Sequence, residues 1–96
     1  MKVGDKIYFE EEKRPYKIRA MDDRFLICTK PYNLKHTVIY TIVDLKLKIR
    51  GTENLVFSMG FETDKLCNEA LKRLQKGETE ISRRNWIPLE LHRELV

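Results

Sequence analysis

The feature that most constrains the fold of this chain is the run Thr37-Val38-Ile39-Tyr40-Thr41-Ile42-Val43, in which every residue is β-branched or aromatic. Such residues suit a pleated and largely buried surface, and a run this short that ends at Asp44 indicates a central strand rather than a buried helix. Because both faces of the run are apolar, we expect a neighbouring strand on each side and a covering layer on each face.

Shorter segments with strand character lie on both sides of this run. Tyr16, Ile18 and Ala20 alternate with Lys17 and Arg19, which predicts a half-exposed strand with the three apolar residues on one face. The pair at 22–23 is a turn signal that makes the next segment its antiparallel partner. The last segment contains a proline at 88, which is typical of an edge strand. The predicted strands cover residues 6–9, 16–20, 24–29, 37–43, 55–57 and 83–89.

Residues 45–50 are compatible with two structures. Leucine or isoleucine alternates there with Lys46, Lys48 and Arg50, and a strict period of two favours a continued strand with three cations on one face. The alternative is a short irregular or helical turn capped by Asp44, which would scatter those cations. We favour the extended form.

One helix is predicted over about residues 63–76, with Thr63 or Asp64 as its N-cap. Gly77 suits the left-handed conformation that ends many helices. The apolar stripe of this helix recurs at three- and four-residue spacing and comprises Leu66, Cys67, Ala70, Leu71 and Leu74.

The pattern as a whole predicts a single α+β domain over residues 1–96. We expect a small, strongly bent antiparallel sheet or an SH3-like barrel of five to six strands, with the helix packed on it. An open antiparallel sheet with the helix across one face is the second choice. No apolar run approaches the roughly 20 residues of a membrane helix, so no membrane association is predicted. The start of the chain is not typical of a signal peptide.

Motifs for catalysis or for binding a metal or cofactor are not evident in the sequence. It contains no Gly-rich phosphate loop, no serine nucleophile elbow and no zinc-protease motif. His36 and His92 lie apart, and Cys28 and Cys67 fall in predicted strand and helix interiors. We expect both cysteines to be buried small hydrophobes, with a disulfide as the alternative. The chain is therefore predicted to be neither an enzyme nor a metal or cofactor protein.

Positive charge gathers in the middle of the chain. Residues 13–50 contain ten basic and three acidic side chains, whereas residues 1–12 and 51–96 are slightly acidic. Clustered cations attract phosphates, and arginine can bind a phosphate with two hydrogen bonds or stack on a base. Alternating charged residues are also ordinary on half-solvated strands, and tryptophan is more often a core residue than a ligand platform. The candidate ligand-binding residues are Arg14, Arg19, Arg24, Lys46, Lys48, Arg50, Arg83, Arg84 and Trp86.

Several stretches together carry a resemblance to a protein group. They are Val3-Gly4-Asp5, Asp23-Arg24-Phe25 with Ile27-Cys28, Lys30-Pro31, Ile39-Tyr40-Thr41-Ile42 with Asp44, Ile49-Arg50-Gly51, Asn54-Leu55, and Arg84-Asn85 with Pro88-Leu89. Taken together, they resemble small uncharacterised accessory proteins of bacteriophages and prophages. The resemblance covers most of the chain and includes no catalytic motif. It implies an accessory protein in the cytoplasm of the bacterial host, and it assigns no site residues.

Charge and resemblance together predict a non-enzymatic binder of an anionic ligand, either a nucleotide or a nucleic acid. One concrete form is a phage protein that sequesters a nucleotide and so blunts host defence. The alternative is an inhibitor or adaptor that docks on a host protein through a strand edge or an aromatic patch. The predicted edge strand near residue 88 also suggests a symmetric homodimer that places two basic faces around one ligand.

Overall fold

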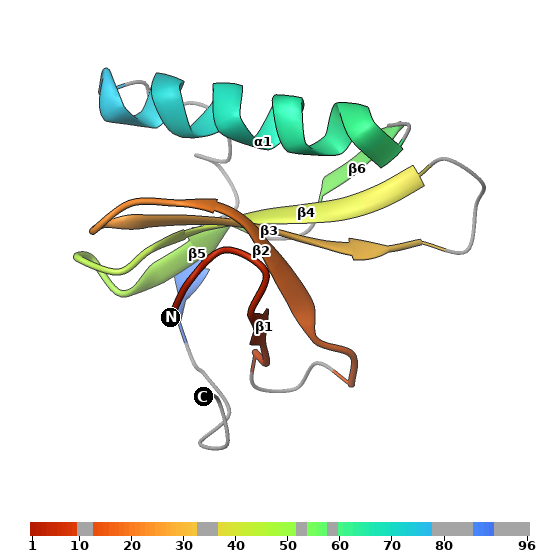
Figure 1. Cartoon of the computed structure of the whole chain (residues 1–96). Coiled ribbons are helices and arrows are strands. Elements are labelled where there is room, and N and C mark those ends of the chain that lie inside the picture. Colours follow the sequence, from red (N-terminus) through yellow and green to blue (C-terminus); the bar gives the residue numbers. More distant parts are fainter. Residues whose placement is uncertain (10–12, 33–36, 52–53, 58–59, 78–85, 90–96) are drawn as a thin grey trace.

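The computed structural model describes residues 1–9, 13–32, 37–51, 54–57, 60–77 and 86–89, with the backbone alone at 54–57, 60 and 61. The described part has an α+β fold, as predicted, in which one helix lies on an antiparallel sheet (Figure 1). Its elements in chain order are β1 (Lys6–Ile7), β2 (Tyr16–Met21), β3 (Phe25–Pro31), β4 (Thr37–Asp44), β5 (Ile49–Gly51), β6 (Asn54–Phe57), α1 (Gly60–Gln75) and β7 (Trp86–Pro88).

The strands follow the order β1-β2-β3-β4-β5-β7, and β6 pairs with β4 beside this path. All the pairings of the described strands are antiparallel. The two end strands, β1 and β7, do not pair with each other, so the sheet is open and the SH3-like barrel is not confirmed. The edge position of β7 agrees with the presence of Pro88, while the homodimer stays a prediction.

Strand β4 is the central strand that the sequence predicts. One of its sides pairs with β3 from Asp44 to Val38, which is all of the strand except Thr37. Its other side is divided, because β6 pairs with the first half of β4 and β5 pairs with Val43 and Asp44. Thr41 lies between these two partners, and its hydroxyl donates a hydrogen bond to the carbonyl oxygen of Gly51. The hydroxyl therefore satisfies a backbone group where the ladder is interrupted.

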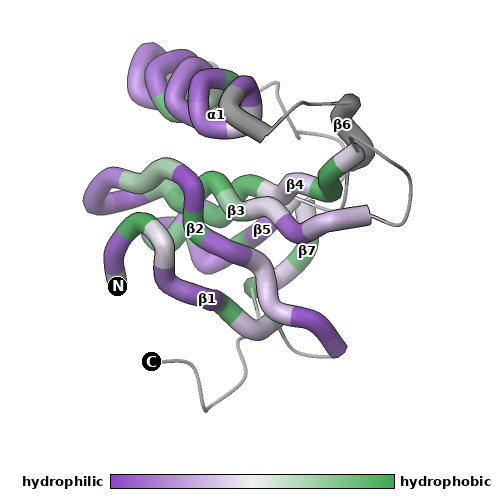
Figure 2. Tube along the Cα trace, turned by 45° about the vertical axis from the view of Figure 1, so that its right-hand side comes forward, coloured by the Kyte–Doolittle hydropathy of each residue, from purple (hydrophilic) through white to green (hydrophobic). Residues whose placement is uncertain are grey.

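Two hydrophobic layers cover the two faces of the sheet, as expected for a strand that is apolar on both sides. In one layer, Ile42 and Ile27 pack under the helix stripe of Cys67, Leu71 and Leu74. The other layer comprises Ile7, Phe9, Tyr16, Ile18, Leu26, Cys28, Ile39 and Val43, with Leu45 and Leu89 against it. Figure 2 shows hydrophobic stretches of β3 and β4 in the middle of the molecule, between α1 and β1. Both cysteines are free and buried, in agreement with the first expectation for them.

A β-bulge at Arg19 corrects the predicted facing of β2. Ile18 pairs with Cys28 and Ala20 pairs with Ile27, so that Arg19 is an extra residue in the ladder. The extra residue reverses the alternation, and Ala20 packs under the helix rather than beside Tyr16 and Ile18. The prediction that all three share one face was wrong for Ala20.

The extended form favoured for residues 45–50 was also wrong. Strand β4 ends at Asp44, residues 45–48 form a turn, and β5 begins at Ile49. One carboxylate oxygen of Asp44 accepts the backbone N–H groups of Lys46 and Leu47 at 3.0 and 3.1 Å. Lys48 has a φ of 55°, which closes the turn in the left-handed region. The local hydrogen bonds of Asp44 thus outweigh the period-two pattern of the residues that follow.

The helix begins at Gly60, before the predicted start, so neither Thr63 nor Asp64 is its N-cap. Both residues lie inside α1: Thr63 is buried, and Asp64 forms an ion pair with Arg19 of β2 that connects the helix to the sheet. The C-terminal prediction is confirmed. Gly77 has a φ of 90°, and its N–H donates to the carbonyl of Leu74 at 2.9 Å.

Candidate anion-binding pocket

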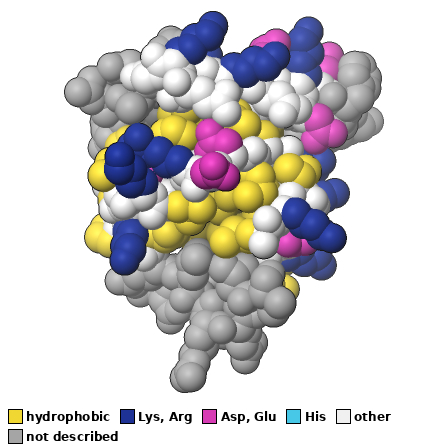
Figure 3. All heavy atoms as spheres, turned by 60° about the vertical axis from the view of Figure 1, so that its left-hand side comes forward, with side chains coloured by type: hydrophobic (Ala, Val, Ile, Leu, Met, Phe, Trp, Pro, Cys, Tyr) yellow, Lys and Arg dark blue, Asp and Glu magenta, His cyan; other side chains and the backbone are white. Residues whose placement is uncertain are grey.

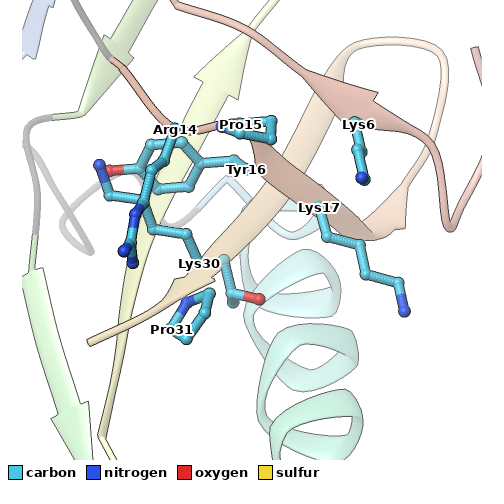
Figure 4. Close-up of a pocket in the computed structure, with 8 residues that line it drawn as sticks. Lys6, Arg14, Pro15, Tyr16, Lys17, Lys30 and Pro31 are labelled. Atoms are coloured by element: carbon cyan, nitrogen blue, oxygen red, sulfur yellow. The ribbon is translucent and has the colours of Figure 1, made fainter. Parts of the chain in front are cut away.

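A pocket of about 270 Å³ lies where the start of β2 meets the end of β3. Four of its eight lining residues are basic, and none of the eight is acidic. Figure 4 shows the side chains of this basic pocket, which come from β1, from the start of β2 and the two residues before it, and from the end of β3. The lining residues are Lys6, Arg14, Pro15, Tyr16, Lys17, Thr29, Lys30 and Pro31.

Two prolines help to place the pocket at the ends of strands. Pro15 directly precedes β2, and Pro31 is the last residue of β3. Neither has an N–H to donate to a ladder, so regular pairing is limited at both positions. Because β2 and β3 are antiparallel neighbours, with Lys17 opposite Thr29, the two prolines come to the same end of the hairpin. Their rings supply apolar walls beside the cations (Figure 4).

Tyr16 and Lys30 form one side of the pocket. The Lys30 ammonium lies 4.7 Å from the centre of the Tyr16 ring, a cation–π contact. The Tyr16 ring also contacts Phe9: the two ring centres are 5.1 Å apart and the ring planes are inclined by 70°, which is an edge contact. Tyr16 is fully buried, so this wall of the pocket is anchored in the hydrophobic layer beneath it.

Lys6 and Lys17 form the other basic pair of the pocket. They are direct cross-strand partners between β1 and β2, and both side chains are exposed. Like charges at opposed positions of a sheet are destabilising, whereas an anion bound between them is favoured by both. No ion pair within the described part of the chain involves either lysine.

Of the candidate residues from the sequence, Arg14 lies in the basic pocket. Arg19 lies on the helix side of the sheet instead, where its Nε donates to Thr29 Oγ1 at 3.0 Å and its Nη1 lies 3.3 Å from Asp64 Oδ1. These bonds connect β2, β3 and α1, which gives Arg19 a structural role in the fold.

Arg24 also has an acidic partner. Its Nε and Nη2 donate to the two carboxylate oxygens of Asp44 at 3.1 and 2.8 Å, and its guanidinium lies 4.8 Å from the centre of the Phe25 ring. Burial acts to raise the pKa of Asp44, but the hydrogen bonds from Arg24 and from two backbone N–H groups outweigh it and lower that pKa. The pair joins the β2–β3 turn to the end of β4.

The other candidates do not gather with Arg14. Lys46 and Lys48 are exposed in the β4–β5 turn, whereas Arg50 is buried and lies 4.4 Å from the centre of the Phe9 ring. Trp86 packs against the helix-side layer, as a core tryptophan does. Figure 3 shows basic side chains spread around a largely hydrophobic area, with acidic groups between them. Arg83 and Arg84 lie outside the described residues.

Three lysines of the pocket, Lys6, Lys17 and Lys30, are not among the candidates that the sequence suggests. Their convergence depends on the register of three strands, which brings Lys6 opposite Lys17 and Lys17 opposite Thr29. A usable signal is present in the prolines at 15 and 31, each of which directly follows a basic residue. Prolines that mark two strand ends in one hairpin predict that their neighbours lie together.

No profile of a known protein family, no curated protein and no solved structure matches this chain. The resemblance to phage accessory proteins therefore stays a prediction. No helix in the part that the structure describes has the length and apolarity needed to cross a membrane. Within the same residues, no three His, Cys, Asp or Glu side chains are grouped as metal ligands would be.

Proposed function

We propose that this chain binds a phosphate-bearing ligand, a nucleotide or a nucleic acid, in the basic pocket and performs no chemistry on it. The observation that carries the proposal is the lining of the pocket, where four of the eight described residues are cations and none of those eight is acidic. Elsewhere in the described part, Arg19 and Arg24 have acidic partners at 3.3 and 2.8 Å. A pocket in which four of the eight described lining residues are cations attracts an anion, because closely placed positive charges favour a negatively charged ligand.

The pocket also has features suited to the organic part of such a ligand. Pro15 and Pro31 give it apolar walls, and ligand sites combine apolar surfaces with a few polar groups that fix orientation. The resemblance to phage accessory proteins extends the proposal to a protein that sequesters its ligand in the host cytoplasm. That extension depends on the resemblance, whereas the pocket supports the binding itself.

A matched pair of double variants tests the proposal. The pocket variant Arg14→Gln with Lys17→Gln and the control variant Lys46→Gln with Lys48→Gln each remove two exposed positive charges. Binding is measured by fluorescence anisotropy with a labelled mononucleotide and a labelled single-stranded oligonucleotide over a range of salt. We expect the pocket variant to weaken binding about tenfold or more, equivalent to about 1.4 kcal/mol. For the oligonucleotide, the slope of log K against log salt should also become shallower by about 0.7 for each phosphate that a cation no longer neutralises.

The control variant has the same net charge as the pocket variant, so it should bind nearly as the unmodified protein does. Thermal unfolding of both variants shows whether the fold is retained. Loss of binding in the control variant alone would place the site at the β4–β5 turn and refute the pocket. Absence of binding by the unmodified protein to both probes at low salt would refute the function.

A further inference from the structure

The four cations of the basic pocket form two pairs on different sides of it, and this division limits the ligand. Successive side chains of a strand point to opposite faces, so Tyr16 and Lys17 diverge from one another. The ring of Tyr16 belongs to the hydrophobic layer with Phe9 and Ile18, and Lys30 lies over that ring. Lys17 is paired with Thr29, whose hydroxyl faces Arg19 and the helix side.

Figure 4 makes the same division visible. Arg14 and Lys30 extend along the ring of Tyr16, whereas Lys17 extends away from them on the side where Lys6 lies. Pro15 is drawn between the two groups, and Pro31 lies below Lys30. We define the first pair, Arg14 and Lys30, as the tyrosine-side pair, and the second pair, Lys6 and Lys17, as the ladder pair.

We propose that the pocket takes a ligand with two separated phosphates, one at each pair, and that this ligand is a short stretch of single-stranded nucleic acid. Successive phosphates of a strand are separated by a sugar, which the apolar walls of the two prolines can contact. The phosphates of a nucleoside diphosphate share a bridging oxygen, so one pair of cations binds both and the second pair is left without an anion. The inference rests on the proposed function and specifies its ligand.

The opposed lysines of the ladder pair support this choice. Lys6 and Lys17 are direct cross-strand partners, so one phosphate bound between them would be attracted by both charges. A ligand that reaches only the tyrosine-side pair leaves the repulsion between these lysines in place. When a second phosphate is covalently linked to the first, it is held close to Lys6 and Lys17. Its effective concentration there is high, which increases the affinity of the whole ligand.

Three ligands separate phosphate spacing from phosphate number. The dinucleotide 5′-phosphothymidylyl-thymidine has two separated phosphates, thymidine 5′-diphosphate has two adjacent ones with the same formal charge, and thymidine 5′-monophosphate has one. Affinities are measured by isothermal titration calorimetry at low salt. We expect the dinucleotide to bind more than tenfold tighter than the diphosphate, and the diphosphate to bind within a few-fold of the monophosphate.

Variants then assign each phosphate to a pair. Lys6→Gln with Lys17→Gln should abolish the advantage of the dinucleotide over the diphosphate. Arg14→Gln with Lys30→Gln should likewise abolish the advantage, whereas the charge-matched control Lys46→Gln with Lys48→Gln should preserve it. Equal affinity for the dinucleotide and the diphosphate would overturn the inference and leave the anion-binding function standing. Failure of all three ligands to bind would overturn the function as well.

Discussion

Replacement of Asp44 by asparagine tests whether the end of β4 is held by charge. Oδ1 of Asp44 accepts from Arg24 Nε and from the backbone N–H groups of Lys46 and Leu47, and Oδ2 accepts from Arg24 Nη2 at 2.8 Å. Asparagine keeps one acceptor oxygen and can retain the first three bonds. It places an NH₂ group against Nη2, so that a charged hydrogen bond is replaced by two opposed donors.

The expected cost follows from the burial of the two partners. Hydrogen bonds to charged groups contribute about 1.5–3 kcal/mol. The Asp44 side chain is 4% exposed, whereas that of Arg24 is 38% exposed, so the guanidinium can turn partly to water. We therefore expect Asp44→Asn to lower the free energy of unfolding by about 2 kcal/mol. In a domain of this size, that loss lowers Tm by roughly 8–16 °C.

Urea unfolding followed by far-ultraviolet circular dichroism measures this loss. Lys46→Ala is the matched control, because the structure uses its backbone N–H while its side chain is exposed, and its effect should stay within about 0.5 kcal/mol. A double-mutant cycle with Arg24→Met should give a coupling energy of about 1–2 kcal/mol. An Asp44→Asn protein as stable as the control, or additive effects in the cycle, would refute the reasoning.

Three further predictions follow from the described residues. Burial acts to raise the pKa values of Asp22 and Asp44, but hydrogen bonds outweigh it and lower both. The two ionised carboxylates therefore stabilise the fold above about pH 4, and this stability should be lost as the pH falls through the lowered pKa values. In an acid titration, the free energy of unfolding of Asp44→Asn should fall less steeply than that of the unmodified protein. Gly77→Ala should cost about 1 kcal/mol in urea unfolding, because the space there is open and only the positive φ opposes a side chain; no loss would contradict this. Burial raises the pKa of Cys28 and raises that of Cys67 to about 11, so Ellman's reagent at pH 8 should label neither thiol until urea unfolds the chain; rapid labelling of the native protein would contradict this.

The sequence predicts the elements of this fold better than their junctions. The apolar run of β4, the helix stripe and the cap at Gly77 are local patterns, and the structure confirms all three. The bulge at Arg19 could not be predicted, because it depends on how β2 pairs with β3 and on the bonds of Arg19 to Thr29 and Asp64. Asp44 was a local indication of the turn at 45–48, because its carboxylate accepts backbone N–H groups of that turn. The alternation of apolar and basic residues after Asp44 favoured a strand instead.

The candidate site was less predictable than the fold, for a physical reason. Charge density along the chain identified the basic middle region, but ion pairs between distant residues decide which cations are compensated. Arg24 meets a carboxylate twenty positions away and Arg19 one forty-five positions away. Neither ion pair can be predicted from residues that are close in the sequence. The grouping of Lys6, Lys17 and Lys30 likewise depends on how the strands pair.

The hydroxyl of Thr41 lies where one side of β4 changes its partner from β6 to β5. Without a polar atom there, a strand so uniformly hydrophobic offers equivalent pairing sites along its whole free side, and one long partner could slide along it. Because the Thr41 hydroxyl binds the carbonyl of Gly51, β5 is fixed to the last residues of β4, and the first half stays available to β6. A valine of the same shape would fill the space but could not form this hydrogen bond, so the Thr41 hydroxyl adds to the backbone pairing that places β5 beside the end of β4.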